Sequence, residues 1–157
     1  MPPAIDSLRR LVQALRTASH HAWSELGVSG AQLFVLQQLG EAAPLSLSAL
    51  AERTHTHASS VSVVVARLVQ RGLVARRAAA DDARRAELSL TAAGRRLLER
   101  APTPVQARLL AAPASLPARE RAQLGRTLAL LCARTGLADA PAIMFFEEAQ
   151  GRSGRGA

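Results

Sequence analysis

The sequence predicts a mainly helical chain with one small antiparallel β-hairpin, an α+β fold, and residues 44–94 are the most informative stretch. A short helix, a tight turn at residues 55–57 and a longer helix are followed directly by two short strands. The predicted helices span residues 48–54 and 58–71, and the predicted strands span 73–77 and 87–90. Gly72 supplies the left-handed residue that ends the longer helix. The apolar residues at helical spacing in that helix are Val61, Val64, Val65 and Leu68. This order predicts a winged helix-turn-helix, whose second helix enters the DNA major groove while the hairpin reaches the backbone.

The second helix and the hairpin carry side chains suited to DNA. Short hydroxyl groups occupy the first turn of that helix, where a groove-inserted helix meets base edges. Ten of the twenty arginines fall between Arg53 and Arg100, against four acidic residues, and the whole chain has a formal net charge of +8. Such a cluster suits a polyanion. The residues expected to contact DNA are His57, Ser59, Ser60, Ser62, Arg67, Arg76, Arg77, Arg84 and Arg85. For His57, capping of the helix, a solvated turn and metal binding are the alternatives.

Several stretches over roughly residues 5–134 resemble the MarR family of winged-helix repressors. The matching stretches are residues 28–36, 45–53, 59–62, 67–68, 72–74, 82–84 and 90–94. Two positions depart from the family pattern: Val63 and Ala83 stand where the family often has a basic residue and an arginine. The resemblance therefore implies DNA binding with fewer ionic contacts from the helix and more from Arg84 and Arg85. It also implies a two-fold homodimer and a regulator that represses from a pseudo-palindromic operator.

The two ends of the chain predict a helical dimerisation region around the DNA-binding domain. We expect residues 1–25 to form an N-terminal dimerisation helix, residues 28–94 the winged domain and residues 95–149 a C-terminal helical dimerisation region. Residues 150–157, with glycine, serine and arginine prominent, should form a disordered tail. The N-terminal apolar stripe has helical period. Its members are Ile5, Leu8, Leu11, Val12, Leu15, Ser19 and Ala22. An intramolecular bundle of the same helices is the alternative.

The remaining helices follow from local signals. Gly27 should end the first helix, and a second should span residues 32–39. Thr91 can cap a helix that begins at Ala92. Prolines then divide the C-terminal region, because each removes a backbone donor and clashes with the preceding turn. The expected pieces are a break at Pro102 and Pro104, a helix at 105–111 closed by Pro113, and a final helix from Pro117 to Arg134. The apolar segment Ile143–Phe146 should pack on the dimer partner rather than on a separate protein.

One group on the first helix is a candidate ligand site. Arg16, His20 and Trp23 follow i, i+4, i+7 spacing, so a cation, a titratable ring and an aromatic ring share one side of the helix. Relatives of the resembling family often respond to small aromatic anions bound between the dimer helices and the winged domain. The three residues could hold such a carboxylate or phenolate. The alternative is a helix surface with a boundary histidine and a core tryptophan.

Other functions find little support in the sequence. Cys132 lies among apolar neighbours and is expected to be a buried structural thiol, with a redox sensor as the alternative. No phosphate loop, nucleophile elbow or metalloprotease helix occurs, so no enzyme and no cofactor are expected. The histidine pairs are poor metal sites. No apolar run approaches a membrane span and the N-terminus lacks a signal-peptide core, so we expect a cytoplasmic location and no membrane partner. An architectural DNA-binding protein without an effector stays open as a second function.

Overall fold

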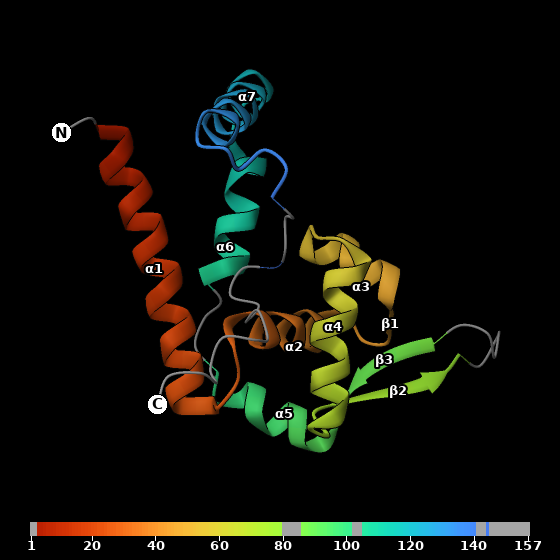
Figure 1. Ribbon diagram of the computed structural model, residues 1–157. Helices are drawn as coiled ribbons and strands as arrows, with labels where there is room; N and C mark the ends of the chain where they lie inside the picture. The colour runs from red at the N-terminus through yellow and green to blue at the C-terminus, as the bar shows by residue number, and fades with distance from the viewer. Residues whose placement is uncertain (1–2, 80–85, 102–104, 141–143, 145–157) are drawn as a thin grey trace, which may run out of the picture.

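The computed structural model describes residues 3–79, 86–101, 105–140 and 144. These residues form seven α-helices and three short strands, arranged around one central helix (Figure 1). The elements are α1 (Pro3–Leu26), α2 (Gly30–Ala42), β1 (Leu45–Ser46), α3 (Leu47–Thr54), α4 (Ala58–Gln70), β2 (Val74–Ala78), β3 (Ala86–Leu90), α5 (Ala92–Glu99), α6 (Val105–Ala111), a 3₁₀ turn (Ala112–Ser115) and α7 (Ala118–Arg134). The predicted class, a mainly α fold with a small antiparallel sheet, is confirmed.

Helix α2 is the centre of the core. All nine residues from 31 to 39 are buried, because α1, α3, α4, α5 and β3 all pack against this helix. It begins two residues before the predicted start, since Ser29 caps it. The Ser29 hydroxyl accepts a hydrogen bond from the Gln32 backbone N–H, and the Gln32 side chain accepts one from the Ser29 N–H. This reciprocal pair is a capping box, which fixes where the chain turns from α1 into α2.

The sheet has three strands in the order β1-β3-β2, one more than the predicted hairpin. Strands β2 and β3 pair antiparallel with Val74 opposite Leu90 and Arg77 opposite Glu87. The missed strand β1 pairs Leu45 with Leu88. Two residues are too few to show a strand pattern in the sequence. The pairing ties the start of α3 to the hairpin and so fixes the helix-turn-helix against the sheet.

The helices after the sheet follow the predicted signals. The Thr91 hydroxyl accepts a hydrogen bond from the Gly94 N–H at 3.0 Å and caps α5. A Cβ built on Gly94 would overlap the Leu73 carbonyl oxygen, so this close approach of α5 to the sheet requires glycine. Helix α5 ends at Glu99 and α6 begins at Val105, which agrees with the predicted break; the prolines of that break lie outside the described residues.

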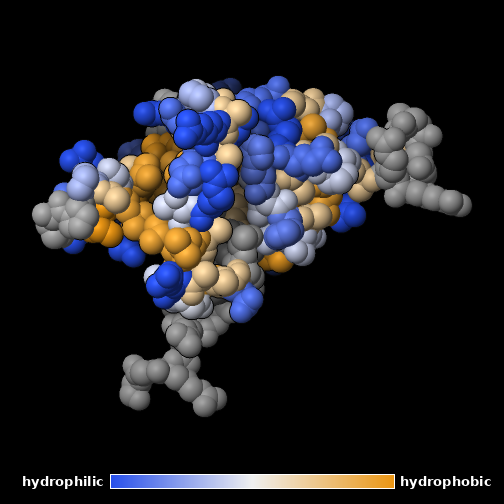
Figure 2. Space-filling view, turned by 90° about the horizontal axis from the view of Figure 1, so that it is seen from above, coloured by the Kyte–Doolittle hydropathy of each residue, from blue (hydrophilic) through white to orange (hydrophobic). Residues whose placement is uncertain are grey.

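The end helices differ from this core. Helix α1 runs beside α6, and α7 lies at the far end of α6, away from the sheet (Figure 1). Within α1 only Leu15 and Ala22 are buried, and α7 has no buried residue. Seen from above, apolar residues gather most densely on the side of the molecule opposite the β2–β3 hairpin (Figure 2). Met144, expected on a partner subunit, is instead buried in this chain's own core; the rest of its apolar segment and the tail at 150–157 lie outside the described residues.

Candidate nucleic-acid interface

The turn between α3 and α4 is built by local hydrogen bonds. Ser46 caps α3 by accepting from the Ala49 N–H. At the other end His55 adopts a left-handed conformation, with φ 51° and ψ 42°. Histidine is one of the residue types that visit this region more often than most. The Thr56 N–H then donates to the Ala51 carbonyl oxygen at 3.1 Å. The chain thereby reverses within three residues and sets α4 across α3.

Helix α4 has one buried and one free face. The residues predicted to form its core side, Val61, Val64, Val65 and Leu68, are all buried, and each contributes roughly 1.5–3 kcal/mol through burial of its apolar side chain. The exposed residues recur at the same helical spacing on the other side. They are Ser59, Ser62, Val63, Ala66, Val69 and Gln70. Ser60 and Arg67 are half-buried at the boundary between the faces. The free face is therefore narrow and built from small, mostly uncharged side chains.

His57 occupies the N-cap position of α4, but it does not perform the helix capping that was one of its expected roles. Its side chain makes no capping hydrogen bond and is exposed. Within the described residues, no group of three or more histidine, cysteine, aspartate or glutamate side chains could hold a metal ion. The His57 ring therefore stands at the start of the free face of α4, available to a phosphate or to water.

The hairpin brings one of its arginines to α4. Arg76 and Arg77 are both exposed on β2, and neighbouring strand residues point to opposite faces of a sheet. Arg76 lines a cavity of about 340 Å³ between α4 and the sheet, together with Ser62 and Val69. Arg77 faces the other way and lies opposite Glu87. Arg76 thus joins the free face of α4, whereas Arg77 does not; Arg84 and Arg85 lie outside the described residues.

Among the described residues, at least four of the clustered arginines bind within the protein. Arg53 donates to Gln38 and forms an ion pair with Glu41 at 2.9 Å. The other three each donate to one acceptor. These contacts are Arg71 to the Gln32 side chain, Arg95 to the Leu90 carbonyl oxygen and Arg100 to the Glu25 carbonyl oxygen. All four stay exposed, but each is held by an acceptor of the chain, and the arginine count in the sequence could not show which arginines are held in this way.

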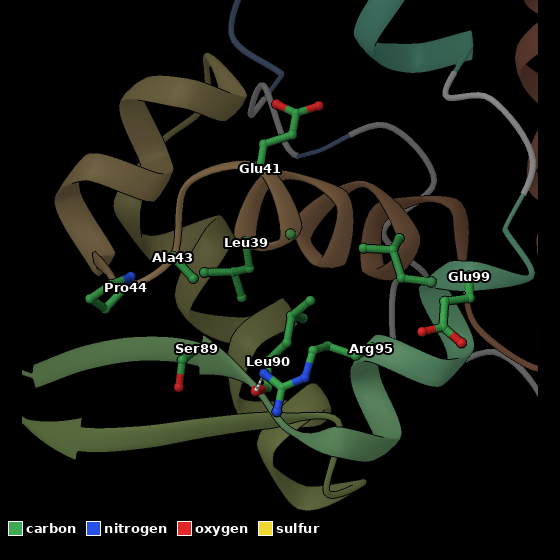
Figure 3. A pocket seen from close by; sticks show the side chains of 10 residues that line it. Leu39, Glu41, Ala43, Pro44, Ser89, Leu90, Arg95 and Glu99 are labelled. Atoms are coloured by element: carbon green, nitrogen blue, oxygen red, sulfur yellow. Dashed lines mark hydrogen bonds between the residues drawn. The ribbon is translucent and has the colours of Figure 1, made fainter.

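A second cavity lies away from α4, between the end of α2, strand β3 and α5 (Figure 3). Its volume is about 560 Å³. Leu39, Leu90 and Leu98 contribute its apolar wall, and Arg95 lies at its edge with one Nη bound to the Leu90 carbonyl oxygen at 3.0 Å. No local pattern in the sequence predicts this cavity, because its lining comes from segments about fifty residues apart.

The predicted ligand group stays on the surface of α1. Arg16, His20 and Trp23 are all exposed, and the indole is 55% exposed, so the expectation of a core tryptophan is wrong. None of the three lines the two cavities above or the 820 Å³ apolar groove along α1 from Ile5 to Ala14. The structure therefore shows three accessible side chains on one helix that do not line the cavities described above.

The expectation of a buried thiol is also wrong for this chain. Cys132 is exposed, because α7 buries no residue against the rest of the described chain. Its apolar neighbours in the sequence are exposed with it: Leu128, Leu130 and Leu131 are all about half-exposed. Within the described residues nothing covers this apolar stretch, and its expected role as a packing surface stays a prediction. None of the helices within the described residues combines the length and the apolar character needed to cross a membrane.

A helix-turn-helix with a free second helix, flanked by a small sheet, defines a winged helix-turn-helix protein. The chain belongs to the MarR family, whose sequence profile matches residues 26–85. It is 38% identical over 88 residues to the HTH-type transcriptional repressor MdtR of Bacillus subtilis; this match covers 56% of the chain and 57% of that relative. The chain therefore spans a little over half the length of this curated relative.

Solved structures extend the likeness over most of the chain. A "probable transcriptional regulator" from Pseudomonas aeruginosa is 32% identical, with a TM-score of 0.51, over 79% of this chain and 92% of that one. The reduced form of MarR from E. coli is 23% identical, with a TM-score of 0.58, over 83% and 97% of the two chains. At that identity the second likeness shows the fold alone. Together they extend the shared fold beyond the winged domain into the end helices.

Proposed function

We propose that this chain is a homodimeric, sequence-specific DNA-binding regulator of transcription that acts in the cytoplasm as a repressor at a pseudo-palindromic operator. The observation that carries the proposal is the free face of α4, with Ser59 and Ser62 exposed and Arg76 brought beside it by the hairpin. Small hydroxyl side chains permit close approach to base edges, while the arginine supplies a phosphate contact. The name of the MdtR relative, a transcriptional repressor, supports the direction of regulation.

The dimer part of the proposal is supported by apolar side chains that the chain leaves in water. Ile5, Leu8, Leu11 and Val12 on α1 are 41–49% exposed. On α7, Leu124, Leu128 and Leu131 are 38–51% exposed and share one side of the helix. Soluble monomers rarely keep such contiguous apolar faces uncovered. A second copy of the same helices would cover them and would place two α4 helices on one duplex.

Two experiments test whether the protein binds DNA with sequence preference. Selection of bound duplexes from a random pool should return a pseudo-palindrome with half-sites about one helical turn apart. Titration should then show an operator preference of about 10³ or more over a scrambled duplex at physiological salt. A preference below about tenfold would instead favour an architectural DNA-binding protein.

We further propose that a small aromatic anion weakens operator binding through Arg16, His20 and Trp23. Their shared exposure on α1, close to the joint with the winged domain, supports this. Arg16→Ala should abolish the response to the anion and leave operator affinity unchanged. By linkage, operator DNA must weaken binding of the anion by the same factor. If no aromatic carboxylate raises the unfolding temperature at millimolar concentration, this part of the proposal fails while the DNA part stands.

The exposed thiol gives a second route to release from DNA. Cys132 lies on α7 beside the apolar residues that a second subunit would cover. Oxidation of the thiol would therefore weaken the proposed interface. Cys132→Ser should remove any loss of operator binding after mild peroxide treatment. Equal loss in the wild type and the variant would exclude the thiol as a sensor.

A further inference from the structure

Two arginines, at the ends of α4 and α5, reach back to the corner between α1 and α2. Arg71 is the C-cap of α4 and Arg100 is the C-cap of α5. Arg71 Nη1 donates to Gln32 Oε1 at 3.1 Å, and Arg100 Nη2 donates to the Glu25 carbonyl oxygen at 3.4 Å. The corner thus receives one contact from each of two helix ends, 39 and 75 residues away in the sequence. One of these helices is the one proposed to read DNA.

The acceptor for Arg71 is itself fixed. Gln32 is only 8% exposed, and its Oε1 also accepts from the Ser29 N–H at 3.1 Å within the capping box. The side chain therefore cannot swing with the arginine. A Cβ built on Gly27 would lie 3.7 Å from Arg71 Nη2, so the guanidinium also packs over the left-handed residue between the two helices. At the other contact, the Arg100 cation meets the carbonyl end of α1, where the helix dipole is negative.

We propose that Arg71, supported by Arg100, is a positioning residue that fixes the angle between α1 and α4. This inference rests on the proposed function, in which α1 joins two subunits and α4 reads DNA. The angle between these helices then sets the separation of the two α4 helices in the dimer. One base pair added between half-sites moves them apart by about 3.4 Å and rotates them by roughly 35°. If the corner is rigid, a duplex with the altered spacing binds weakly. If the corner is flexible, such a duplex can still bind, but the corner must become ordered on binding, which lowers the affinity.

The test compares operators whose half-sites are separated by the selected spacing and by one or two base pairs more or less. Arg71→Met removes the donor, and Gln32→Met removes the acceptor while filling nearly the same buried volume. For the wild type we expect affinity to fall on the order of tenfold for one base pair. Both variants should bind the best operator less tightly and should lose only about two- to threefold for the same change. The double variant should behave like either single one.

Ser29→Ala is the matched control. It breaks the hydroxyl half of the capping box and should lower the unfolding temperature, but it leaves Gln32 Oε1 for Arg71. Its spacing profile should match the wild type, which separates positioning from stability. Arg71→Lys should recover part of the profile through its ammonium group, which can still donate to Gln32, and this variant replaces Gln32→Met in the comparison if Gln32→Met does not fold.

Two results would overturn the inference. If Arg71→Met weakens every spacing by one factor and lowers the salt dependence, while Gln32→Met changes nothing, Arg71 is a phosphate contact. If both variants keep the sharp wild-type profile, the corner is fixed by other contacts. Failure of the proposed function is distinct, because the wild type itself would then show no preference for operator over scrambled DNA.

Discussion

The winged part of the molecule and its end helices use similar amino acids in opposite ways. From α2 to α5, one side of each helix packs leucine and valine into a shared core, and Leu36, Leu50 and Leu68 are each 0% exposed. On α7, leucines at comparable spacing stay about half-exposed, and none is buried. The winged part is therefore stabilised by its own core. The described residues leave the apolar side chains of α7 uncovered, and we expect stability and assembly to respond to mutation separately.

The largest effect on stability should come from a substitution in the core of the winged part. Leu68→Ala removes a fully buried side chain that joins α4 to the rest of the core. We expect the free energy of unfolding to fall by about 2–5 kcal/mol, measured by urea denaturation. Val69→Ala, one residue further on and 38% exposed, is the control and should cost less than about 1 kcal/mol. Equal losses would mean that α4 is not anchored through its valine and leucine face.

A smaller effect is expected at the end helices, and it should appear in assembly. Leu128→Glu with Leu131→Glu places two charges on the apolar side of α7. Light scattering should show monomers, and operator affinity should fall about a hundredfold or more as the two DNA contacts become independent. Leu130→Glu lies on a different side of the same helix with a similar exposed fraction, and should keep the dimer. A doubly charged variant that stays dimeric would remove α7 from the interface.

This contrast also separates what the sequence could predict from what it could not. Periodicity placed α1 and α4, and the signals at Thr91 and Gly72 placed the ends of their helices, because these depend on neighbours within a turn or two. Strand β1 and the Ser29 capping box were missed. The first is only two residues long, and the second lay before the expected start of its helix. Short elements depend on contacts with distant segments, which leave no local pattern.

The candidate site was predicted by type more accurately than by residue. Hydroxyl side chains on α4 were predicted to face DNA, but the helix turns Ser59 and Ser62 outward and leaves Ser60 half-buried. Arginines were counted as one positive cluster, yet Arg53 and Arg71, although exposed, donate hydrogen bonds to other residues of the chain. Whether an arginine is held within the chain depends on which acceptors the fold brings near it. That information is absent until distant helices meet.

A third, weaker effect should separate the two arginines of β2. Arg76 lies beside the free face of α4 and Arg77 lies on the opposite sheet face. Arg76→Ala should weaken operator and scrambled duplexes alike, by roughly three- to tenfold, and should reduce the slope of log affinity against log salt by about one per subunit. Arg77→Ala is the charge-matched control and should change the slope less. If the two variants behave identically, the arginines act only through net charge and the hairpin does not position Arg76 on DNA.

The smallest effect should come from the hydroxyls of α4, and it bears on sequence preference alone. Ser62 is exposed on the free face, whereas Ser60 is half-buried at its edge. Ser62→Ala should lose on the order of 1 kcal/mol at the operator while random-sequence affinity and the salt slope stay unchanged, because base edges differ between duplexes and phosphates do not. Ser60→Ala should lose less than half of that, since its hydroxyl has less access to the groove. Titrations of both variants on operator and scrambled duplexes at several salt concentrations measure the difference. A larger loss for Ser60 than for Ser62 would mean that α4 lies in the groove with its Ser60 side toward the bases. Val63 and Ala66 would then be turned away from the bases.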